Sequence, residues 1–293
     1  MKDNSAKKNN VHDRKRLSDN PLYRPEIPRD SEKGFPLLQI SNQFYMMNDL
    51  VIDSEIHVQL QNIITENLNS KKLYAKAMQP KKNILFCGPP GTGKTFAAKV
   101  ISSVLPYPFV YVLFDALISS FLGETATNLR KIFSFIEKGR FVVLFDEFDV
   151  VGKKRDDPNE HGEIKRVVNN FIQMLDNYHG ESIIIAATNH PHLLDTAVWR
   201  RFDEILYFDL PNSFQRNQLF TNYLKLIEVE EDFGLSLLVR KTNKFSGADI
   251  AKICNDAIRR VLIENRKTVT KGDLALSLKD QIRRKKILKK INK

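Results

Sequence analysis

A glycine-rich loop at residues 88–95, with the sequence GPPGTGKT, has the composition and spacing of a phosphate-binding site. It fits the pattern G-x-x-x-x-G-K-[ST], and it lies between an apolar run typical of a buried strand and a segment predicted to be helical. Its glycines allow backbone N–H groups to turn inward around an anion, and the following helix directs its positive end to the same place. In such a loop we expect Lys94 to contact the β- and γ-phosphates of a nucleotide and the Thr95 hydroxyl to bind Mg²⁺.

An acidic pair, Asp146 and Glu147, follows the apolar run at residues 141–145. In a P-loop NTPase, a carboxylate in this place holds Mg²⁺ and so neutralises charge on the transferring phosphoryl group. We expect Asp146 to take this part and Glu147 to act as the general base on the attacking water. An isolated acidic pair at a strand end is often only exposed surface, but the loop upstream favours the catalytic interpretation.

Two further polar features follow later in the chain. Asn189 comes after the apolar run at residues 183–187, and the carboxyl ends of parallel strands border the ligand crevice of such sheets. Asn189 is therefore either a turn residue or a hydrogen-bonding partner of the attacking water or the γ-phosphate. Arg200 and Arg201 are either surface charge or the source of an arginine that reaches a neighbouring subunit's γ-phosphate. A guanidinium suits that role because it is always charged and forked, and such an arginine raises kcat by a factor on the order of 10³–10⁵.

Alternating apolar runs and helical periodicities are predicted to position these residues. Strands are expected at residues 83–87, 109–113, 141–145, 183–187 and 204–208. Helices are expected at residues 53–74, 125–135 and 167–175, besides the one after the glycine-rich loop. Continuous apolar strands are typical of a parallel sheet covered on both faces, so we predict an α/β fold with a P-loop NTPase parallel sheet core. Residues 34–49 are expected to pack on this core.

The pattern changes after Pro211 to helical segments alone. Asn212 is a good N-cap with Gln215 three residues later, and Thr270 is expected to cap the last helix. The further helices are predicted at residues 235–240, 248–264 and 272–290. We therefore predict a small C-terminal all-helical domain. The predicted organisation is a flexible polar arm at residues 1–33, a large domain at 34–210, a helical domain at 211–280 and a basic tail at 281–293.

Composition excludes some classes of function. Two cysteines, Cys87 and Cys254, provide neither a disulfide framework nor a metal-ligand spacing. The first residues lack an apolar secretion segment, and no run approaches the ~18 apolar residues of a membrane helix, so we expect a soluble cytoplasmic protein without membrane partners. The net charge is +11, to which seven Lys or Arg in residues 281–293 contribute. This tail is either solvated, in contact with other subunits, or bound to nucleic acid.

Taken together, these motifs resemble the AAA family of ring-forming ATPases over residues 46–279. GPPGTGKT is similar to the family's Walker A motif, FDEFD at residues 145–149 to its Walker B motif, and ATN at residues 187–189 to sensor 1. LDTAVWRRFD at residues 194–203 resembles the second region of homology with its arginine fingers, and FSGADI at residues 245–250 resembles the lid motif. The resemblance implies a P-loop α/β domain, a four-helix lid, and a homo-oligomer, a hexamer, that binds ATP and Mg²⁺ at subunit interfaces.

The resemblance also assigns site residues. It implies catalytic roles for Glu147, Asn189, Arg200 and Arg201, and metal ligation by Thr95 and Asp146. It implies nucleotide contacts for Gly88, Pro89, Pro90, Gly91, Thr92, Gly93, Lys94, Thr95, Phe96, Gly247 and Ala248. Arg200 and Arg201 are adjacent, whereas many members carry Pro-Gly between them, so which of the two contacts the γ-phosphate stays open. Asn177 occupies the glycine slot of the family's inter-subunit Asp-Gly-aromatic signal.

Phe121, Leu122 and Gly123 resemble the aromatic–hydrophobic–Gly pore loop that grips a polypeptide in the family's rings. The alternative is a core phenylalanine followed by a turn glycine, but within the family match the pore-loop interpretation is favoured. Residues 156–161 are expected to form a second pore loop.

The leading functional hypothesis is an ATP-driven remodeller or unfoldase that threads protein clients through a hexameric pore. The sequence contains no His-Glu-x-x-His motif, so any proteolysis would need a separately encoded protease. The alternative is an ATP-fuelled nucleic-acid loader or initiator, which the basic tail favours and the aromatic Phe121 opposes. A nucleotide-binding scaffold without turnover is a third hypothesis, opposed by the intact set of Lys94, Asp146, Glu147 and Asn189.

Overall fold

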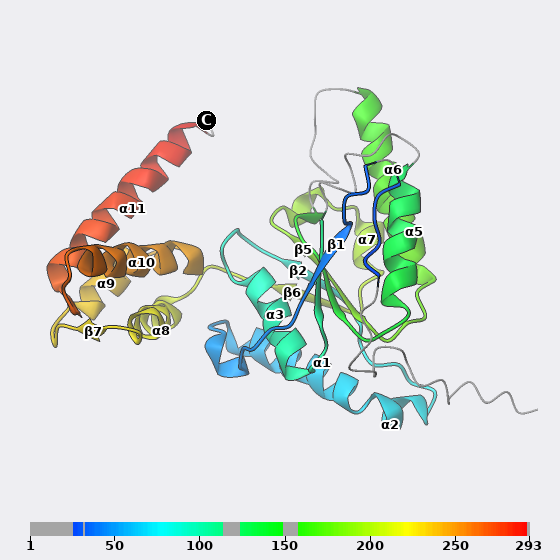
Figure 1. The fold of residues 1–293 in the computed structure, drawn as a ribbon, viewed down its shortest axis with the longest axis horizontal. Helices are drawn as coiled ribbons and strands as arrows, with labels where there is room; N and C mark the ends of the chain where they lie inside the picture. Colours follow the sequence, from blue (N-terminus) through cyan, green and yellow to red (C-terminus); the bar gives the residue numbers. More distant parts are fainter. Residues whose placement is uncertain (1–25, 32, 114–123, 149–157, 292–293) are drawn as a thin grey trace, which may run out of the picture.

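Two domains make up the described part of the chain, a sheet domain that ends with strand β6 and a lid that begins with helix α8 (Figure 1). The computed structural model describes residues 26–31, 33–113, 124–148 and 158–291. Residues 208–212 connect the two domains. The change of sequence pattern after Pro211 therefore falls within this connection.

A six-stranded sheet with the order β1-β3-β4-β5-β2-β6 forms the centre of the sheet domain. Its strands are β1 (Leu38–Ser41), β2 (Asn83–Cys87), β3 (Phe109–Val112), β4 (Val142–Phe145), β5 (Ile183–Thr188) and β6 (Glu204–Tyr207). β1 is antiparallel to β3, and the other neighbouring pairs are parallel. The predicted α/β class and the five predicted strands are confirmed. Residues 34–49 do more than pack on the core, because part of this segment forms the edge strand β1.

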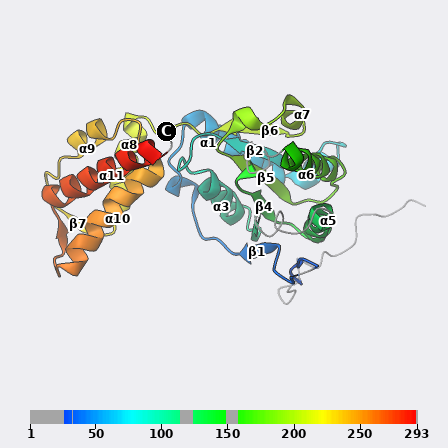
Figure 2. The same ribbon diagram turned by 90° about the horizontal axis from the view of Figure 1, so that it is seen from above.

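Helices cover both faces of the sheet (Figures 1 and 2). They are α1 (Ser54–Leu68), α2 (Ser70–Tyr74), α3 (Lys94–Val104), α5 (Glu124–Ile136), α6 (Pro158–Asp176) and α7 (Thr196–Trp199), with the short 3₁₀ helices η2 (Met47–Asp49) and η4 (Pro191–Leu193). Successive residues of β4 face opposite sides: Val143 and Phe145 pack with α5 and α6, whereas Val142 and Leu144 pack with α1 and α3. Each buried Val, Leu or Phe stabilises the fold by about 1.5–3 kcal/mol. Because both faces are covered, the strands are apolar along their whole length.

The last residues of the expected flexible arm pack against the sheet domain. Residues 1–25 and residue 32 lie outside the described residues, but Arg29 pairs with Pro36 in an isolated β-bridge, and Ile27 joins the core beside α5. The Asp30 carboxylate is buried and accepts a hydrogen bond from the Asn128 side chain at 3.1 Å. The expected domain boundary at residue 34 is therefore wrong, because these local contacts already anchor the preceding residues.

The lid contains four helices and a minimal parallel sheet. The helices are α8 (Ser213–Leu224), α9 (Leu235–Lys241), α10 (Gly247–Ile263) and α11 (Lys271–Ile291), and the strands are β7 (Glu228–Val229) and β8 (Thr268–Val269). The predicted helical lid is confirmed, and the structure adds to it two strands of two residues each, which are too short to show a periodicity. The capping box predicted at Asn212 is confirmed, with reciprocal bonds to Gln215 of 2.8 and 2.9 Å. Thr270 caps α11 through Asp273, as predicted.

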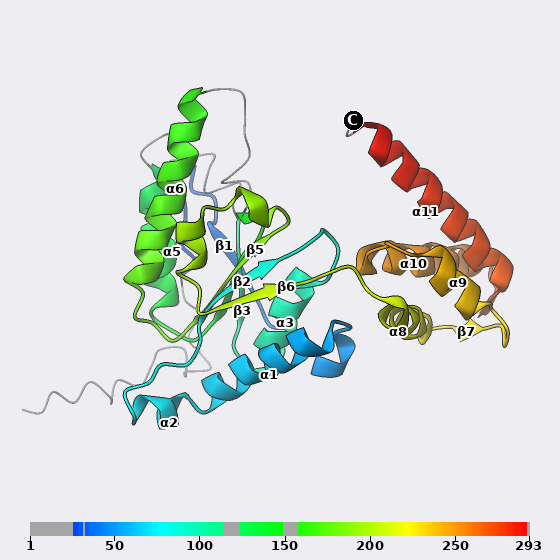
Figure 3. The ribbon, with the colours of Figure 1, turned by 180° about the vertical axis from the view of Figure 1, so that it is seen from behind.

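The described part of the predicted basic tail is the second half of α11 (Figure 3). The helix continues because Leu274, Leu278 and Ile282 recur at four-residue spacing and pack into the lid core. Its later residues extend past α10 (Figure 3). The expectation of a separate tail from residue 281 is therefore wrong. The described part of this basic segment belongs to the last lid helix, and two of its residues bond to α10.

Candidate active site

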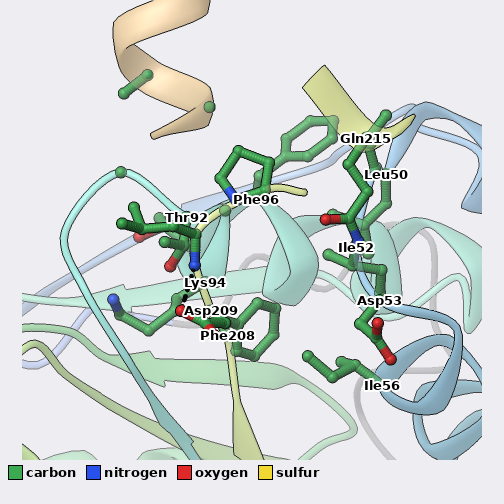
Figure 4. A pocket seen from close by; sticks show the side chains of 18 of the residues that line it. Leu50, Ile52, Asp53, Ile56, Thr92, Lys94, Phe96, Phe208, Asp209 and Gln215 are labelled. Carbon is green, nitrogen blue, oxygen red and sulfur yellow. Dashed lines mark hydrogen bonds between the residues drawn. The ribbon is translucent and has the colours of Figure 1, made fainter. Parts of the chain in front are cut away.

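A cavity of about 1040 Å³ lies between the sheet domain and the lid. Its lining residues are drawn from 49–59, 90–96, 205–223 and 247–251, together with Asp146, Glu147 and Asn189. Figure 4 shows Leu50, Ile52 and Ile56 on one side of the cavity and Thr92 and Lys94 on the other. The volume is at the upper end of that of small-molecule and cofactor sites.

Glycine is required at two positions of the loop that floors this cavity. Gly88 has a φ of +135°, and a Cβ there would lie 2.1 Å from the Phe208 carbonyl oxygen. Gly91 has a φ of +76°, and a Cβ there would lie 2.8 Å from both the Ala248 Cβ and the Ser246 Oγ. The loop therefore passes closer to its neighbours than any side chain allows, and it leaves room for a phosphate chain beside the first turn of α3.

Lys94 and Asn189, predicted from separate motifs, meet beneath this loop. Lys94 is only 6% exposed. Its Nζ donates hydrogen bonds to the carbonyl oxygens of Gly88 at 2.7 Å and Pro89 at 2.9 Å, and to Asn189 Oδ1 at 2.8 Å. The ammonium group is therefore held at the base of the cavity by neutral oxygens. A phosphate oxygen would bind it more strongly than these oxygens do, because the phosphate is negatively charged.

Thr95 and Asp146 also meet, although 51 residues separate them in the chain. The Thr95 hydroxyl donates to Asp146 Oδ2 at 2.7 Å, and Asp146 Oδ1 accepts from the Glu147 backbone N–H at 2.9 Å. Glu147 is exposed at the cavity wall and has a φ of +53°. The three residues bring a hydroxyl and two carboxylates to one edge of the sheet, where strand β4 ends.

The lid reaches the same loop through its helix α10. The Ala248 backbone N–H donates to the Gly91 carbonyl at 3.1 Å, and a Cβ at Gly247 would lie 3.3 Å from the same oxygen. Both Gly247 and Ala248 line the cavity. The predicted lid motif and the glycine-rich loop are therefore direct neighbours.

Arg200 and Arg201 are not brought to this cavity. Both are exposed at the end of α7, and neither is among the described residues that line the cavity. Arg201 Nη1 lies 3.5 Å from Asp176 Oδ2, a half-exposed contact of small energetic value. Asp203, two residues on, accepts hydrogen bonds from the backbone N–H groups of Lys82 and Asn83, both at 2.9 Å. The arginine pair is thus fixed near the start of β2, whereas the glycine-rich loop follows its end.

Comparisons with known proteins assign this architecture. Residues 84–210 match the ATPase family associated with various cellular activities (AAA), and residues 232–276 match the AAA+ lid domain. An uncharacterised AAA family ATPase of Sinorhizobium fredii is 39% identical over 238 residues, covering 81% of this chain and 72% of that protein. This chain belongs to the AAA family.

Two further comparisons concern relatives of this AAA ATPase with more specific names. A proteasome-activating nucleotidase of Saccharolobus solfataricus is 33% identical over 78% of this chain, which spans only 61% of that protein's length. The crystal structure of the FIGL-1 AAA domain superposes with a TM-score of 0.67 and 25% identity, covering 83% of this chain and 85% of that one. The fold predicted from the sequence is confirmed by these matches.

The AAA ATPase hydrolyses ATP, and AAA ATPases bind ATP generally with Mg²⁺. Two features of the cavity fit these groups. The glycine-rich loop ends at the first turn of α3, which lines the cavity and whose N–H groups favour a phosphate. The oxygens of Thr95 and Asp146 are the hard donors that Mg²⁺ prefers. Among the described helices, none combines the length and the apolar character needed to cross a membrane.

One wall of the cavity was not predicted from the sequence. It is formed by residues 49–53, just before α1, with buried Leu50 and half-buried Ile52. This wall offers backbone groups and the apolar surface of Leu50, Val51 and Ile52, while the Asp49 and Asp53 carboxylates accept backbone N–H bonds; the segment carries no motif. The one available signal is the apolar run LVI directly before Asp53, which caps α1 by accepting from the Glu55 N–H at 2.9 Å.

Some predicted residues lie outside the described residues. These are Phe121, Leu122 and Gly123 of the first predicted pore loop and residues 156–157 of the second. Residues 158–161, also predicted for the second pore loop, form the start of α6. Gly88 and Pro89 do not line the cavity among the described residues, but their carbonyl oxygens anchor Lys94 beneath it.

Proposed function

We propose that this AAA ATPase uses ATP hydrolysis in this cavity to remodel or unfold protein clients, and that it does so as a ring of identical subunits, a hexamer. The observation that carries the proposal is the distribution of the site residues. Lys94, Thr95, Asp146 and Asn189 meet in one cavity, whereas Arg200 and Arg201 lie outside it. A site whose arginine must come from elsewhere is completed by a second subunit.

The residues of the cavity divide the chemistry among them. Lys94 balances the charge of the β- and γ-phosphates, and the backbone of the glycine-rich loop donates to their oxygens. Thr95 and Asp146 hold Mg²⁺, which neutralises charge on the transferring phosphoryl group. Glu147 accepts the proton of the attacking water, and Asn189 orients the water or the γ-phosphate. The exposed position of Glu147 on the cavity wall leaves its carboxylate free to approach a bound water.

The arginine pair serves the neighbouring subunit in this proposal. Asp203 ties the loop of Arg200 and Arg201 to the start of β2, so the loop is held at a defined place on its own domain. In a ring built from heterologous contacts, the arginine pair on one surface of each subunit faces the nucleotide cavity of the next subunit. Arg200 is exposed and can approach the neighbouring site directly. Arg201 would first have to leave its contact with Asp176 before it could bind a phosphate oxygen.

The client proposal rests on sequence and on relatives rather than on the cavity. Phe121 and Gly123 match the pattern of a pore loop, and an aromatic there grips an extended polypeptide without regard to its sequence. The proteasome-activating nucleotidase is a relative whose name favours protein-directed work over nucleic-acid loading. A separately encoded protease is a further proposed partner, which the name of the proteasome-activating nucleotidase favours.

A mixing experiment tests the shared site. One variant carries Lys94→Ala, and the other carries both Arg200→Ala and Arg201→Ala. Each alone is expected to be inactive, because the first cannot bind ATP and the second cannot complete a neighbour's site. Mixed in equal amounts, the two variants should regain about a quarter of the wild-type rate. Each interface needs an intact loop from one subunit and an intact arginine pair from the next, and half of the subunits carry each, so about a quarter of the interfaces are complete. Sedimentation must show that both variants assemble like wild type.

No recovery on mixing, with assembly intact, contradicts the shared site. So does wild-type hydrolysis by the arginine variant alone. The client proposal is tested separately with Phe121→Ala, which is expected to keep basal ATP hydrolysis within a few fold of wild type and to lose remodelling of a protein client, while Phe121→Tyr retains it. If nucleic acid but no protein stimulates the wild-type enzyme, the loader hypothesis replaces the unfoldase.

A further inference from the structure

The second half of α11 is bonded to the first turn of α10. Lys285 Nζ donates to Asp249 Oδ2 at 2.5 Å, and Gln281 Nε2 donates to Asp249 Oδ1 at 2.7 Å. Gln281 and Lys285 are four residues apart, so they lie one turn apart on the same face of the helix. We call these three side chains the brace. Two of its members come from the basic segment that the sequence alone suggests is a free tail.

Asp249 is held from several directions. Besides Gln281 and Lys285, its Oδ2 accepts from the Ser246 backbone N–H at 2.9 Å, and its own N–H donates to Ser246 Oγ at 3.2 Å. Its side chain is 16% exposed and that of Lys285 30%. Burial works to raise the pKa of Asp249, but the bonds from Lys285 and Ser246 outweigh it and hold the pKa below its ordinary value. The Asp249 carboxylate is therefore ionised at neutral pH.

Lys285 has a second contact in the same place. Its Nζ lies 4.4 Å from the centroid of the Phe245 ring, which is buried in the lid core. A cation over an aromatic face is attracted to it. The ammonium group is thus fixed both by the carboxylate on α10 and by the residue that precedes the cap Ser246.

The turn held by the brace is the turn that contacts the glycine-rich loop. Ala248, which precedes Asp249, donates its backbone N–H to the Gly91 carbonyl at 3.1 Å. Ser246, the cap of α10, lies so close to Gly91 that a Cβ there would be 2.8 Å from the Ser246 Oγ. Four consecutive residues, 246–249, therefore connect α11 on one side to the floor of the cavity on the other.

We propose that Lys285 and Gln281 are positioning residues that hold the first turn of α10 against the glycine-rich loop and thereby raise the affinity of the cavity for nucleotide. Without them the turn keeps its capping box between Ser246 and Asp249 and its contact with Gly91, but it loses its bonds to α11, so part of its ordering has to take place when nucleotide binds. That ordering is a free-energy cost of binding, which the brace removes in advance. The proposal rests on the nucleotide site proposed above.

The chain offers a matched control at the other end of α11. Arg266 makes two bonds to the Asp273 carboxylate, of 2.9 Å to Oδ2 and 2.7 Å to Oδ1. This pair has the same chemistry and also joins lid segments, but neither residue is among the described residues that line the cavity. Breaking it weakens the lid without touching residues 246–249.

The experiment measures the Kd of Mg²⁺-ADP for the full chain by calorimetry, well below the unfolding temperature. Lys285→Met is expected to raise the Kd about two- to fivefold, the range of a partly exposed charged pair. Lys285→Arg should restore it, because a guanidinium also donates to the carboxylate. Arg266→Met should leave the Kd unchanged while lowering thermal stability. In ATP hydrolysis, Lys285→Met should raise KM and leave kcat within about twofold of wild type.

Two outcomes overturn the proposal: an unchanged Kd in Lys285→Met, or an equal rise in Lys285→Met and Arg266→Met, which would mean that general weakening of the lid causes the effect. Gln281→Leu provides a second variant if Lys285→Met fails to fold, and the same criteria apply to it. Lys94→Ala separates this proposal from the site itself. If Lys94→Ala binds ADP as wild type does, the nucleotide site is wrong, whatever the brace does.

Discussion

The sheet domain and the lid contribute different chemistry to the two walls of the cavity. The sheet domain supplies an ammonium, a hydroxyl and carboxylates at the ends of buried strands, namely Lys94, Thr95, Asp146 and Glu147. The lid supplies small residues and backbone, with Gly247 and Ala248 against the loop. The charged groups follow strands β2 and β4 in the chain, and the lid encloses the space beside them. Changes on the sheet-domain wall should therefore have larger effects on nucleotide binding and turnover than changes on the lid wall.

The largest expected effect is that of Lys94→Ala, which removes the main cation of the sheet-domain wall. Nucleotide binding should be abolished, because charge-assisted bonds to the β- and γ-phosphates are lost. Calorimetric titration with ADP measures this. Lys99→Ala, on the same helix but outside the described lining, is the matched control and should bind as wild type. Equal loss in both variants would mean that helix α3, and not the Lys94 charge, is responsible.

Glu147→Gln should separate the chemistry from the binding on that same wall. The phosphate and Mg²⁺ partners survive, so ATP still binds, whereas turnover should fall by a factor on the order of 10²–10⁴, as expected for loss of a general base. The measurement is phosphate release alongside nucleotide affinity. Unchanged turnover would remove Glu147 from its proposed role.

A pair of single-methyl changes compares the two walls directly. In Gly91→Ala the new Cβ lies 2.8 Å from Ala248 and Ser246 atoms at a positive φ, whereas in Gly247→Ala it lies 3.3 Å from the Gly91 carbonyl. The first should raise the Kd for nucleotide about tenfold, because a strained backbone and a clash add up to roughly 1–2 kcal/mol. Gly247→Ala should raise the Kd for nucleotide by less than about twofold, since a small shift of the Gly91 carbonyl relieves the close contact. A larger effect at Gly247 would reverse the comparison.

The smallest effect on the reaction is expected for Asp273→Asn, which weakens the lid without changing the cavity. The Arg266 guanidinium holds the pKa of the Asp273 carboxyl well below its usual range. A lowered folded-state pKa stabilises the protein above the unfolded-state value of about 3.9 and loses that contribution as the pH falls further. The unfolding temperature of Asp273→Asn should therefore be lower than that of wild type at pH 7, with a difference that narrows below about pH 4. A constant difference would contradict the ionic origin.

How much of the molecule the sequence predicts depends on the range of the interactions involved. The strands at 83–87, 142–145 and 183–188 are found because burial on both faces leaves uninterrupted apolar runs. The Walker-type residues are found because their spacing is fixed by a local loop. Strand β1 escapes prediction because it is a short edge strand, and β7 and β8 because two residues have no period.

The remaining misses are long-range pairings. Lys285 looks like one charge in a basic tail until the fold places it beside Asp249, 36 residues earlier. Residues 49–53 form a wall of the cavity through backbone and apolar surface. Backbone groups and common apolar side chains give no sequence signal for a binding site. Arg200 and Arg201 are identified by type, but only the structure shows that they lie outside the described lining of the cavity.

The left-handed backbone at Glu147 has a consequence for adaptation. Its φ of +53° costs a residue with a Cβ about 1–2 kcal/mol, and the neighbouring Asp146 carboxylate helps to maintain it through the bond from the Glu147 N–H. A glycine at this position would relieve the strain and make the folded protein more heat-resistant, but it would lack the proposed base. Selection for thermal stability and selection for turnover therefore act in opposite directions at position 147. A library screened only for survival of heating should become enriched in inactive variants with glycine at this position.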